Sequence, residues 1–362
     1  MSLSPQSQLL ERNIDILSSG KCLVINPADS LFLRAQKDTA LTIMHQYYDV
    51  FSQSVRTTSA LKLDSRDLIS RANGFEETVT MGKHTHVFAP FLLSAPQYTD
   101  IVIYMPKSKP HTQMLLAMAA CMLTLDGRLY LVGENKGGIK SAGKLLEQYG
   151  PVQKLDSARH CSLLCCQVTA QVPLFDPIKW LKSANYELNG TEWEVSSLPG
   201  VFSHGELDAG TKLLLEKLPT SFRGSVLDFA CGAGVIGSYI VSQFPHVNLT
   251  LSDVSALALY CTALSVNDNG HHATLIAANG LSGIEEKFDT IVTNPPFHTG
   301  VKTDYSITEA FVRRSPSLMK SGASMYMVAN RFLPYPGLLS ESFNDFNTLA
   351  QDTKFSVYLT SR

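Results

Sequence analysis

Short apolar runs alternate with helix-like segments along the second half of the chain. Ser225–Phe229 predicts a strand, and the stretch from Val235 to about Phe244 predicts a helix. The alternation continues with predicted strands at Val247–Ser252, Ala273–Ala277, Asp289–Thr293, Ala323–Val328 and Phe355–Leu359, and with a helix from Ser255 to about Asn267. Strands that alternate with helices in this way predict an α/β fold with a mostly parallel sheet and helices on both faces.

The first half of the chain repeats part of this pattern. Thr99–Pro106 resembles Phe288–Pro295, and each is followed by a helical stretch and then by a strand led by Gly127 or Gly322. An asparagine follows eight residues after each of these glycines, and each copy ends in an apolar strand. Any two α/β units share such a pattern in part, but the order and spacing favour duplication, and hence two tandem Rossmann-like domains.

The composition changes near residues 170–200. Gln171–Pro177 carries two prolines, and Ser196–Gly200 is rich in turn residues. The predicted division is a first domain at 1–170, a linker at 171–200 and a second domain at 201–362. The first domain has no glycine-rich turn after its early strand and no Asn-Pro-Pro, so we expect it to have the fold without the chemistry and to serve RNA binding or structural support.

The overall composition indicates a globular protein. Apolar residues make up 44% and charged residues 17% of the 362 residues. No apolar run is long enough for a membrane span, the N-terminus lacks the features of a signal peptide, and the seven cysteines form no CxxC pair. We therefore expect a cytoplasmic protein that contacts no membrane and binds no metal.

A net charge of −2 does not indicate a nucleic-acid binder, but one segment of the chain has a basic local balance. Residues 101–160 hold eight Lys and Arg against four Asp and Glu. From this segment Lys107, Lys136, Lys140 and Lys144 are predicted to contact RNA. A solvated face of the domain is the alternative interpretation.

A glycine-containing turn follows the strand that ends at Phe229. Gly232 and Gly234 let the backbone approach a ligand closely, and Ala230 stands in the same turn. Asp228 lies at the carboxyl end of the strand, where α/β folds bind ligands. No Lys-Ser or Lys-Thr follows as in a phosphate-binding loop. The anionic Asp228 also suits a cationic ligand without phosphate better than it suits a pyrophosphate.

Later strand ends supply further polar groups. Asp253 follows Asp228 by 25 residues and can accept both ribose hydroxyls of a nucleoside. Capping of the following helix is its alternative role, which Ser255 could equally fill. Val254 is assigned to the same pocket. Asn279 is placed to contact an adenine edge, although an Asn before Gly is also typical of turns.

Asn294-Pro-Pro-Phe297 stands at the end of another predicted strand. Proline keeps the preceding residue extended, so the Asn294 side chain is held at the sheet edge. Its amide oxygen and the Pro295 carbonyl can accept both hydrogens of an amino group, whose lone pair can then attack an electrophilic methyl. Phe297 can stack on the base that carries the amine, with Pro296 completing the motif. Such an amine needs no general base, so His298 is assigned to substrate positioning.

In this order, Asp228 to Gly234, Asp253 and Asn294 to Phe297 resemble the motifs of class I amino-methyltransferases. Six further stretches resemble the bacterial ribosomal small-subunit guanine-N2 methyltransferase C family: Pro106–Lys109, Gly133–Ser141, Pro199–Ser203, Leu207–Thr211, Asn294–Gly300 and Val328–Pro336. The resemblance covers nearly the whole chain and is strongest from about residue 99 onward.

This resemblance implies S-adenosylmethionine as cofactor and methylation of one guanine N2 of 16S rRNA in the small (30S) ribosomal subunit. It also implies a duplicated architecture in which only the C-terminal copy binds the cofactor. Ala230 departs from the glycine usual in such turns, and a methyl group is tolerated there if φ is negative.

Three other functions remain as alternatives. A glutamine-N5 protein methyltransferase also uses Asn-Pro-Pro, but commonly with Tyr in place of Phe297 and with a small helical front domain. An adenine-N6 nucleic-acid methyltransferase would use the same amine chemistry in a different pocket. An RNA-binding scaffold without activity is disfavoured by the intact Asp228, Asp253 and Asn294. A monomer is expected, because a doubled fold lets one chain bury what a homodimer otherwise would.

Overall fold

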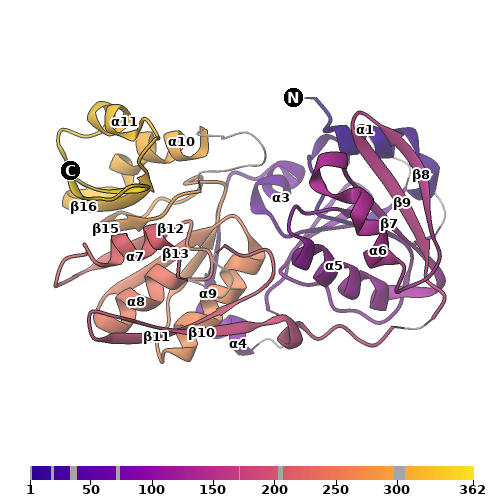
Figure 1. Cartoon of the computed structure of the whole chain (residues 1–362), viewed down its shortest axis with the longest axis horizontal. Coiled ribbons are helices and arrows are strands. Elements are labelled where there is room, and N and C mark those ends of the chain that lie inside the picture. The colour runs from indigo at the N-terminus through magenta and orange to yellow at the C-terminus, as the bar shows by residue number, and fades with distance from the viewer. Residues whose placement is uncertain are drawn as a thin grey trace. The chain divides into compact units, whose positions relative to one another are not determined.

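The computed structural model describes residues 2–17, 20–32, 39–70, 74–170, 172–202, 207–296 and 306–362. The chain forms two compact units, and Figure 1 labels many of their elements. The first unit comprises Met1–Thr57, Asn73–Leu181 and Leu198–Gly200. The second unit comprises Thr58–Ala72, Lys182–Ser197 and Val201–Arg362.

Among the described residues, the larger sheet of the second unit has the strand order β17-β18-β16-β15-β12-β13-β14-β3. These strands are β3 (Leu61–Asp64), β12 (Ser225–Phe229), β13 (Asn248–Asp253), β14 (Thr274–Ala277), β15 (Phe288–Thr293), β16 (Met319–Asn330), β17 (Phe346–Gln351) and β18 (Phe355–Ser361). The strands from β14 through β13, β12 and β15 to β16 are parallel, whereas β3, β18 and β17 pair antiparallel. The carboxyl ends of the parallel strands therefore meet at one edge of the sheet.

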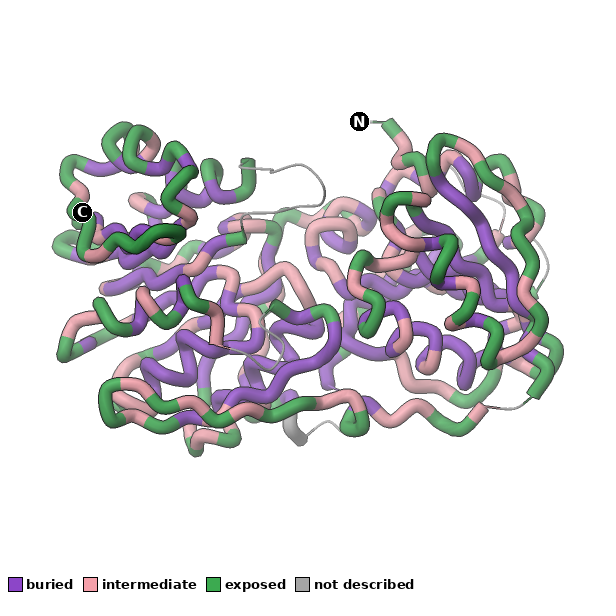
Figure 2. Tube along the Cα trace, viewed as in Figure 1, coloured by how far each residue is buried: buried purple, intermediate pink, exposed green. Residues whose placement is uncertain are grey.

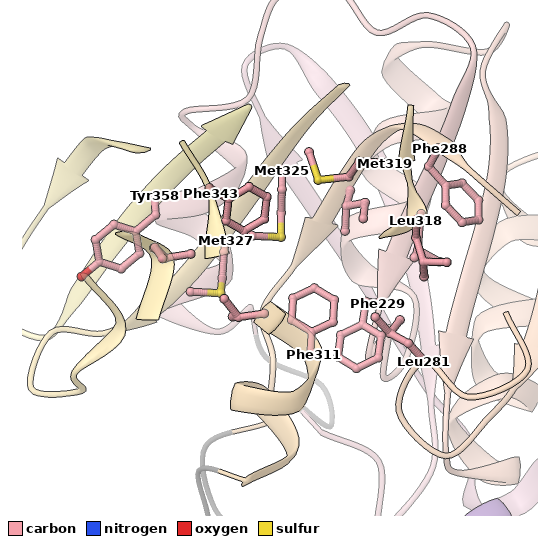
Figure 3. Close-up of a cluster of buried hydrophobic side chains, with 14 of the residues drawn as sticks. Phe229, Leu281, Phe288, Phe311, Leu318, Met319, Met325, Met327, Phe343 and Tyr358 are labelled. Atoms are coloured by element: carbon pink, nitrogen blue, oxygen red, sulfur yellow. The ribbon is translucent and has the colours of Figure 1, made fainter. Parts of the chain in front are cut away.

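The helices of the second unit are α4 (Ser65–Ser70), α7 (Ala209–Leu215), α8 (Val235–Gln243), α9 (Ala256–Asp268), α10 (Ser306–Arg314) and α11 (Tyr335–Ser342), with the 3-10 helix η4 (Ser315–Leu318). Apolar side chains of α10 and α11 belong to a buried cluster on the sheet. Figure 3 shows part of this cluster, including Phe311 of α10. There the ring of Phe311 stacks on that of Phe229, with 4.1 Å between the ring centroids. From β12 the chain proceeds through α8 and α9 to β13 and β14 on one side of the sheet, whereas β15 and β16, which α10 connects, lie on the other side of β12. Right-handed crossovers in these two opposite directions place α8 and α9 on the other face of the sheet from α10.

The sheet of the first unit has the order β4-β5-β2-β1-β6-β7-β9-β8. These strands are β1 (Cys22–Ile25), β2 (Leu41–His45), β4 (Glu77–Met81), β5 (His84–Phe88), β6 (Tyr98–Tyr104), β7 (Leu123–Glu134), β8 (Val152–Ala158) and β9 (Cys161–Gln167). The helices are α1 (Pro5–Arg12), α3 (Tyr48–Val55), α5 (Lys109–Met122) and α6 (Ile139–Leu146), with the 3-10 helices η1 (Ile14–Leu17), η2 (Asn135–Gly137) and η3 (Pro177–Trp180). Figure 2 shows that the central strands of both units are buried.

The two sheets share one topology. In the first unit β5, β2, β1, β6 and β7 are parallel, whereas β4, β9 and β8 pair antiparallel, which repeats the second unit position by position. An ion pair recurs as well. Asp100 on β6 bonds to Arg128 at 2.7 Å, and Asp289 on β15 bonds to Lys320 at 2.7 Å. The predicted fold of two tandem, mostly parallel α/β units is confirmed.

The compact units differ from the predicted division at 171–200. Instead of a linker, residues 182–197 form a hairpin of β10 (Lys182–Leu188) and β11 (Thr191–Ser197) that belongs to the second unit (Figure 1). Trp193 of β11 packs against Tyr239 of α8, with 5.0 Å between the ring centroids. The backbone N–H of Ser196 donates to Ser265 Oγ at 3.0 Å on α9. The hairpin is ordered because it covers these two helices.

A segment from the first third of the chain also joins the second unit. Strand β3 pairs antiparallel with β14 and covers its otherwise open edge, and α4 follows it directly. Separately, in the described ranges of the chain every helix is too short or too polar to cross a lipid bilayer.

We predict that Ser65→Ala destabilises the second unit. Ser65 is fully buried, its Oγ accepts from the Ala273 N–H at 3.0 Å, and it donates to Asn267 Oδ1 at 3.2 Å. The substitution leaves these buried groups without their partner, so the free energy of unfolding should fall by about 1–3 kcal/mol. Denaturant unfolding checks this in a Trp180→Phe background, where Trp193 is the remaining tryptophan and reports on the second unit.

The matched control is Ser340→Ala at an exposed position of α11, which should change the free energy of unfolding by less than about 0.5 kcal/mol. If Ser65→Ala also stays within that range, the account of how the segment 58–72 is fixed is wrong.

Candidate active site

Two carboxyl groups and one amide lie at the carboxyl edge of the second sheet. Asp228 stands near the end of β12 and Asp253 at the end of the adjacent β13, while Asn294 directly follows β15 on the other side of β12. Because these strands are parallel neighbours, residues 25 to 66 positions apart in sequence reach one edge. The structure thus brings together the polar residues that sequence analysis selected.

Asp228 is fully buried. Its Oδ2 accepts from the Gly237 N–H at 3.0 Å, and among the described residues its Oδ1 has no hydrogen-bond partner. The pKa of Asp228 is raised to about 8, mainly because the carboxyl group is buried; the bond from Gly237 opposes the shift and the negative charge of Asp253 adds to it. A buried carboxyl group with an unused acceptor and a raised pKa is suited to a positively charged partner, whose charge would favour its ionised form.

Glycines let the turn after β12 fold closely around its neighbours. Gly232 and Gly234 have φ of +56° and +80°. A Cβ atom on Gly234 would stand 3.1 Å from the Thr262 backbone, and one on Gly237 would stand 2.3 Å from Leu251 Cδ2. Gly237 completes a Gly-x-Gly-x-x-Gly spacing with the other two. The glycine spacing alone is therefore also compatible with a dinucleotide, and only the buried Asp228 argues against one.

Ala230 occupies the left-handed region, with φ of +57°. The condition on which its methyl group was expected to be tolerated, a negative φ, is therefore not met. An alanine here is strained relative to glycine, because its Cβ approaches the following carbonyl oxygen. The surrounding turn, with Ala230 packed on the core beneath it, holds the residue in this conformation.

The Asp253 side chain connects the turn after β12 with the start of α9 after β13. Its Oδ2 accepts from the Gly232 N–H at 3.0 Å, and its Oδ1 accepts from the Ser255 N–H at 2.8 Å. The side chain of Ser255 caps α9 by accepting from the Ala258 N–H. Capping thus falls to Ser255, and Asp253 remains a partly exposed acceptor beside the glycine turn, with a pKa raised by burial.

The other two residues predicted to contact the cofactor are Val254 and Asn279. Val254 is half-buried next to Asp253. Asn279 is exposed in a turn after β14, where its carbonyl accepts from the Ser282 N–H at 3.1 Å and Gly280 has φ of +59°. The geometry around Asn279 fits the turn role that sequence analysis left open and leaves its side chain accessible to a ligand.

The Asn294 amide nitrogen has two hydrogen-bond acceptors. It donates to Asp208 Oδ2 at 3.1 Å and to Thr211 Oγ1 at 2.9 Å. Pro295 is buried, while Pro296 is exposed and accepts from Thr308 Oγ1 at 3.0 Å. Phe297 and His298 lie outside the described residues.

Four residues near this edge were not assigned a role from sequence. Asp208 and Thr211 contact Asn294, as described above. Phe332 follows β16, whose carboxyl end lies at the same edge, and is 82% exposed. Phe202 is 63% exposed, with its Cβ 3.8 Å from where a Cβ on Gly232 would lie. Phe202 and Phe332 stand out because large aromatic side chains are seldom so exposed unless they contact a ligand or partner.

The predicted RNA-contacting lysines lie in the first unit and are all exposed. Lys107 follows β6 and Lys136 lies in η2 after β7, so both stand at the carboxyl edge of that sheet. Lys140 and Lys144 are one helical turn apart on α6, which begins three residues after Lys136. Among the described residues none of the four forms an ion pair, so their charge is available to an anionic partner.

The first unit lacks the chemical groups of the second at matching positions. Leu23 pairs with Thr42 and Ile101, just as Val226 pairs with Leu249 and Thr290. Counting along each strand from these pairs gives the residues of the first unit that stand where Asp228, Asp253 and Asn294 stand in the second: Ile25, Gln46 and Met105. None of the three can ionise.

Gln46 is moreover engaged within the first unit. Its side chain accepts from Asn26 Nδ2 at 2.7 Å and donates to the Pro90 carbonyl at 2.8 Å. The neighbouring His45 contacts His86 at 3.0 Å, and burial lowers the pKa of His45 well below its usual range. The side chains around Gln46 are thus neutral and bond to other groups of the first unit, and the charge at this edge comes from the exposed lysines.

Comparison with known proteins agrees with this geometry. Residues 192–359 match the methyltransferase small domain, and residues 64–184 match the N-terminal domain that accompanies it. The chain is 55% identical to a ribosomal RNA small subunit methyltransferase C of Alteromonas mediterranea, over 99% of both proteins. It is 41% identical to the protein of that name from Pseudoalteromonas atlantica, over 99% of this chain and all of the relative.

The fold is also that of a solved structure of a T. thermophilus 16S rRNA N2 G1207 methyltransferase in complex with AdoMet and guanosine. The TM-score is 0.82 at 22% identity, covering 99% of this chain and 92% of the other. The fold, the site and the matched domains define a Rossmann-like methyltransferase with a duplicated architecture. Within that class, the chain belongs to the ribosomal RNA small subunit methyltransferase C family.

We predict that Ala230→Gly stabilises the protein. Glycine removes the left-handed strain at φ of +57°, and its greater freedom in the unfolded chain offsets part of the gain. The net increase in the free energy of unfolding should be up to about 1 kcal/mol, which thermal unfolding can detect. Ala233→Gly is the matched control: this buried alanine of the same turn has no positive φ, so its substitution should be destabilising. A destabilising Ala230→Gly would refute the strain.

A pH-dependent prediction concerns Asp228→Asn. Since the pKa of Asp228 is raised from 3.8 to about 8, its contribution to stability is fully present below pH of about 4 and is lost as the pH rises towards 8. Asparagine does not ionise. The thermal midpoint of the ligand-free variant, relative to that of the wild type at the same pH, should therefore be higher at the upper end of this pH range than at its lower end. Melting curves at pH of about 5 and about 8 measure the gain, and an equal difference at both values would contradict a raised pKa.

Proposed function

We propose that this protein transfers a methyl group from S-adenosylmethionine to the exocyclic N2 of a guanine in 16S rRNA, acting on the small (30S) ribosomal subunit. The observation that carries the proposal is the orientation of Asn294. Its amide nitrogen donates two hydrogen bonds within the protein, so its amide oxygen is the group left to accept from an amine at the sheet edge. Membership of the methyltransferase C family supports the RNA substrate.

The residues at the edge fit this cofactor. Asp253 is a partly exposed carboxylate that can accept the ribose hydroxyls, and the turn at Gly232 and Gly234 gives the backbone a close approach. Asp228, with its unused Oδ1, matches a ligand that carries positive charge and no phosphate. Val254, Asn279 and Ala230 complete the proposed pocket. When bound, S-adenosylmethionine supplies an electrophilic methyl group.

The protein's part in the reaction is positioning. Asn294 Oδ1 and the Pro295 carbonyl accept the two amine hydrogens, which directs the nitrogen lone pair away from the protein groups and towards the methyl carbon. By its place in the motif, Phe297 stacks on the guanine and His298 holds the substrate. The N–C bond would form as the bond between the methyl carbon and the cofactor sulfur breaks, which would leave a neutral thioether and put the positive charge on the nitrogen. The nitrogen then releases a proton to solvent. No side chain is needed as a general base before transfer.

The first unit is proposed to bind RNA without binding cofactor. Ile25, Gln46 and Met105 stand where the second unit has Asp228, Asp253 and Asn294, so a ribose would find no carboxylate there and an amine would find no asparagine amide. The exposed lysines at its carboxyl edge are suited to rRNA phosphates. We further propose that the protein works in the cytoplasm as a monomer.

Methyl transfer from labelled S-adenosylmethionine tests the proposal. Acceptors are undermethylated small subunits, large subunits, naked 16S rRNA and a release factor, with the label identified after digestion. Label in N2-methylguanosine from small subunits supports the proposal. Label confined to adenine or to release-factor glutamine would replace it with one of the alternative amine substrates.

The lysines yield a separate prediction. Reversing the charge of Lys136, Lys140 and Lys144 to Glu should weaken binding to small subunits and lower the salt dependence by roughly one unit of slope for each phosphate that is no longer neutralised. Equilibrium binding across salt concentrations measures both effects. Lys154→Glu, an exposed lysine on β8, is the control for a general charge effect. Unchanged affinity and turnover in the triple variant would remove these lysines from the RNA interface.

A further inference from the structure

Asn294 is oriented by two residues that precede it by more than 80 positions in the chain. Its Nδ2 donates to Asp208 Oδ2 at 3.1 Å and to Thr211 Oγ1 at 2.9 Å. An amide nitrogen has two hydrogens, and these two bonds use both. The orientation of the amide group is therefore determined by its partners.

The two partners are themselves fixed. Asp208 caps α7, with its Oδ2 accepting from the Thr211 N–H at 2.9 Å, and Thr211 Oγ1 donates to the same oxygen at 3.3 Å. Thr211 is only 5% exposed, so its hydroxyl has little freedom to turn towards water. Because that hydroxyl gives its hydrogen to Asp208, it presents a lone pair to Asn294.

The reversed orientation of Asn294 is disfavoured by charge. Turning the amide by 180° would place its oxygen against the Asp208 carboxylate and leave both acceptors without a donor. In the observed orientation the amide oxygen is directed away from these two acceptors. A negatively charged partner thus discriminates between the two orientations of the amide, which differ little in shape.

We propose that Asp208 and Thr211 are positioning residues for methyl transfer: they hold the Asn294 amide so that its oxygen, and never its nitrogen, faces the amine of the substrate. The inference rests on the proposed function and adds to it a requirement from outside the Asn-Pro-Pro motif. Asn294 with its nitrogen towards the substrate would oppose donor to donor and repel the amine.

The Thr211 hydroxyl separates positioning from helix capping. The cap of α7 uses the Asp208 carboxylate and the Thr211 backbone, neither of which changes in Thr211→Val, and valine has nearly the shape of threonine. We expect Thr211→Val to lower kcat by about 10-fold to about 100-fold, because one of the two restraints on the amide is removed. The dissociation constant for S-adenosylmethionine and the thermal midpoint should stay close to those of the wild type. Thr211→Ser, which keeps the hydroxyl, should restore most of the turnover.

Asp208 allows a parallel comparison. Asp208→Ser retains an oxygen that can cap α7 but is too short to reach Asn294, so kcat should fall with little change in cofactor binding. Asp208→Asn keeps a long acceptor and should retain more turnover than Asp208→Ser. A fall in the thermal midpoint that parallels the loss of kcat across these variants would indicate a structural role instead and overturn the proposal.

A double-mutant cycle with Asn294→Ala gives the decisive readout, with undermethylated small subunits and labelled S-adenosylmethionine as substrates. If Thr211 acts through Asn294, Thr211→Val has no further effect on kcat once Asn294 is alanine. Independent, multiplicative losses would overturn the proposal. Should wild-type protein label adenine or glutamine instead of guanine, the substrate assignment fails, but the same cycle run on that substrate still tests the positioning. A wild-type protein that methylates none of these acceptors would overturn both.

Discussion

The site depends on the parallel pairing of three adjacent strands, β13, β12 and β15. Parallel pairing fixes where each strand ends, and in this order it places two carboxyl groups and one amide at the same edge of the sheet. The stacking of Phe311 on Phe229 then fixes α10 on the face of the sheet beside β12. Without this pairing, the glycine turn after β12 and the Asn-Pro-Pro motif after β15 would not lie at the same edge.

Most of the second unit could be predicted from sequence because its central strands are short, apolar and closely followed by helices. The predicted strand at Ser225–Phe229 is the observed β12, and the other parallel strands and the helices between them agree to within a few residues at most of their ends. The hairpin at 182–197 was missed because its polar side chains alternate on an exposed face and its order comes from packing on α8 and α9. Strand β3 was missed because nothing local shows that residues 61–64 pair with residues more than 200 positions later.

The same distinction holds within the site. The positions of Asp228, Asp253 and Asn294 could be predicted from the local sequence, since each stands at the end of a predicted strand. Asp208 and Thr211 could not be assigned a role from sequence, because their contact with Asn294 exists only once α7 packs beside the sheet. The backbone conformation of Ala230 depends on the surrounding turn, and no pattern of residues gives the sign of its φ. Duplication accounts for the different roles that we propose for the two units, since one copy has two carboxyl groups and an amide at the edge and the other has Ile25, Gln46 and Met105 at the matching places.

The central claim is that only one of the two copies binds the cofactor. Isothermal calorimetry of S-adenosylmethionine binding to the full chain measures this most directly, run on the wild type and on Asp253→Ala. The account predicts one site per chain, strongly weakened by Asp253→Ala because the acceptor for the ribose hydroxyls is removed. Two sites per chain, or a single site that keeps its affinity in Asp253→Ala, would contradict it.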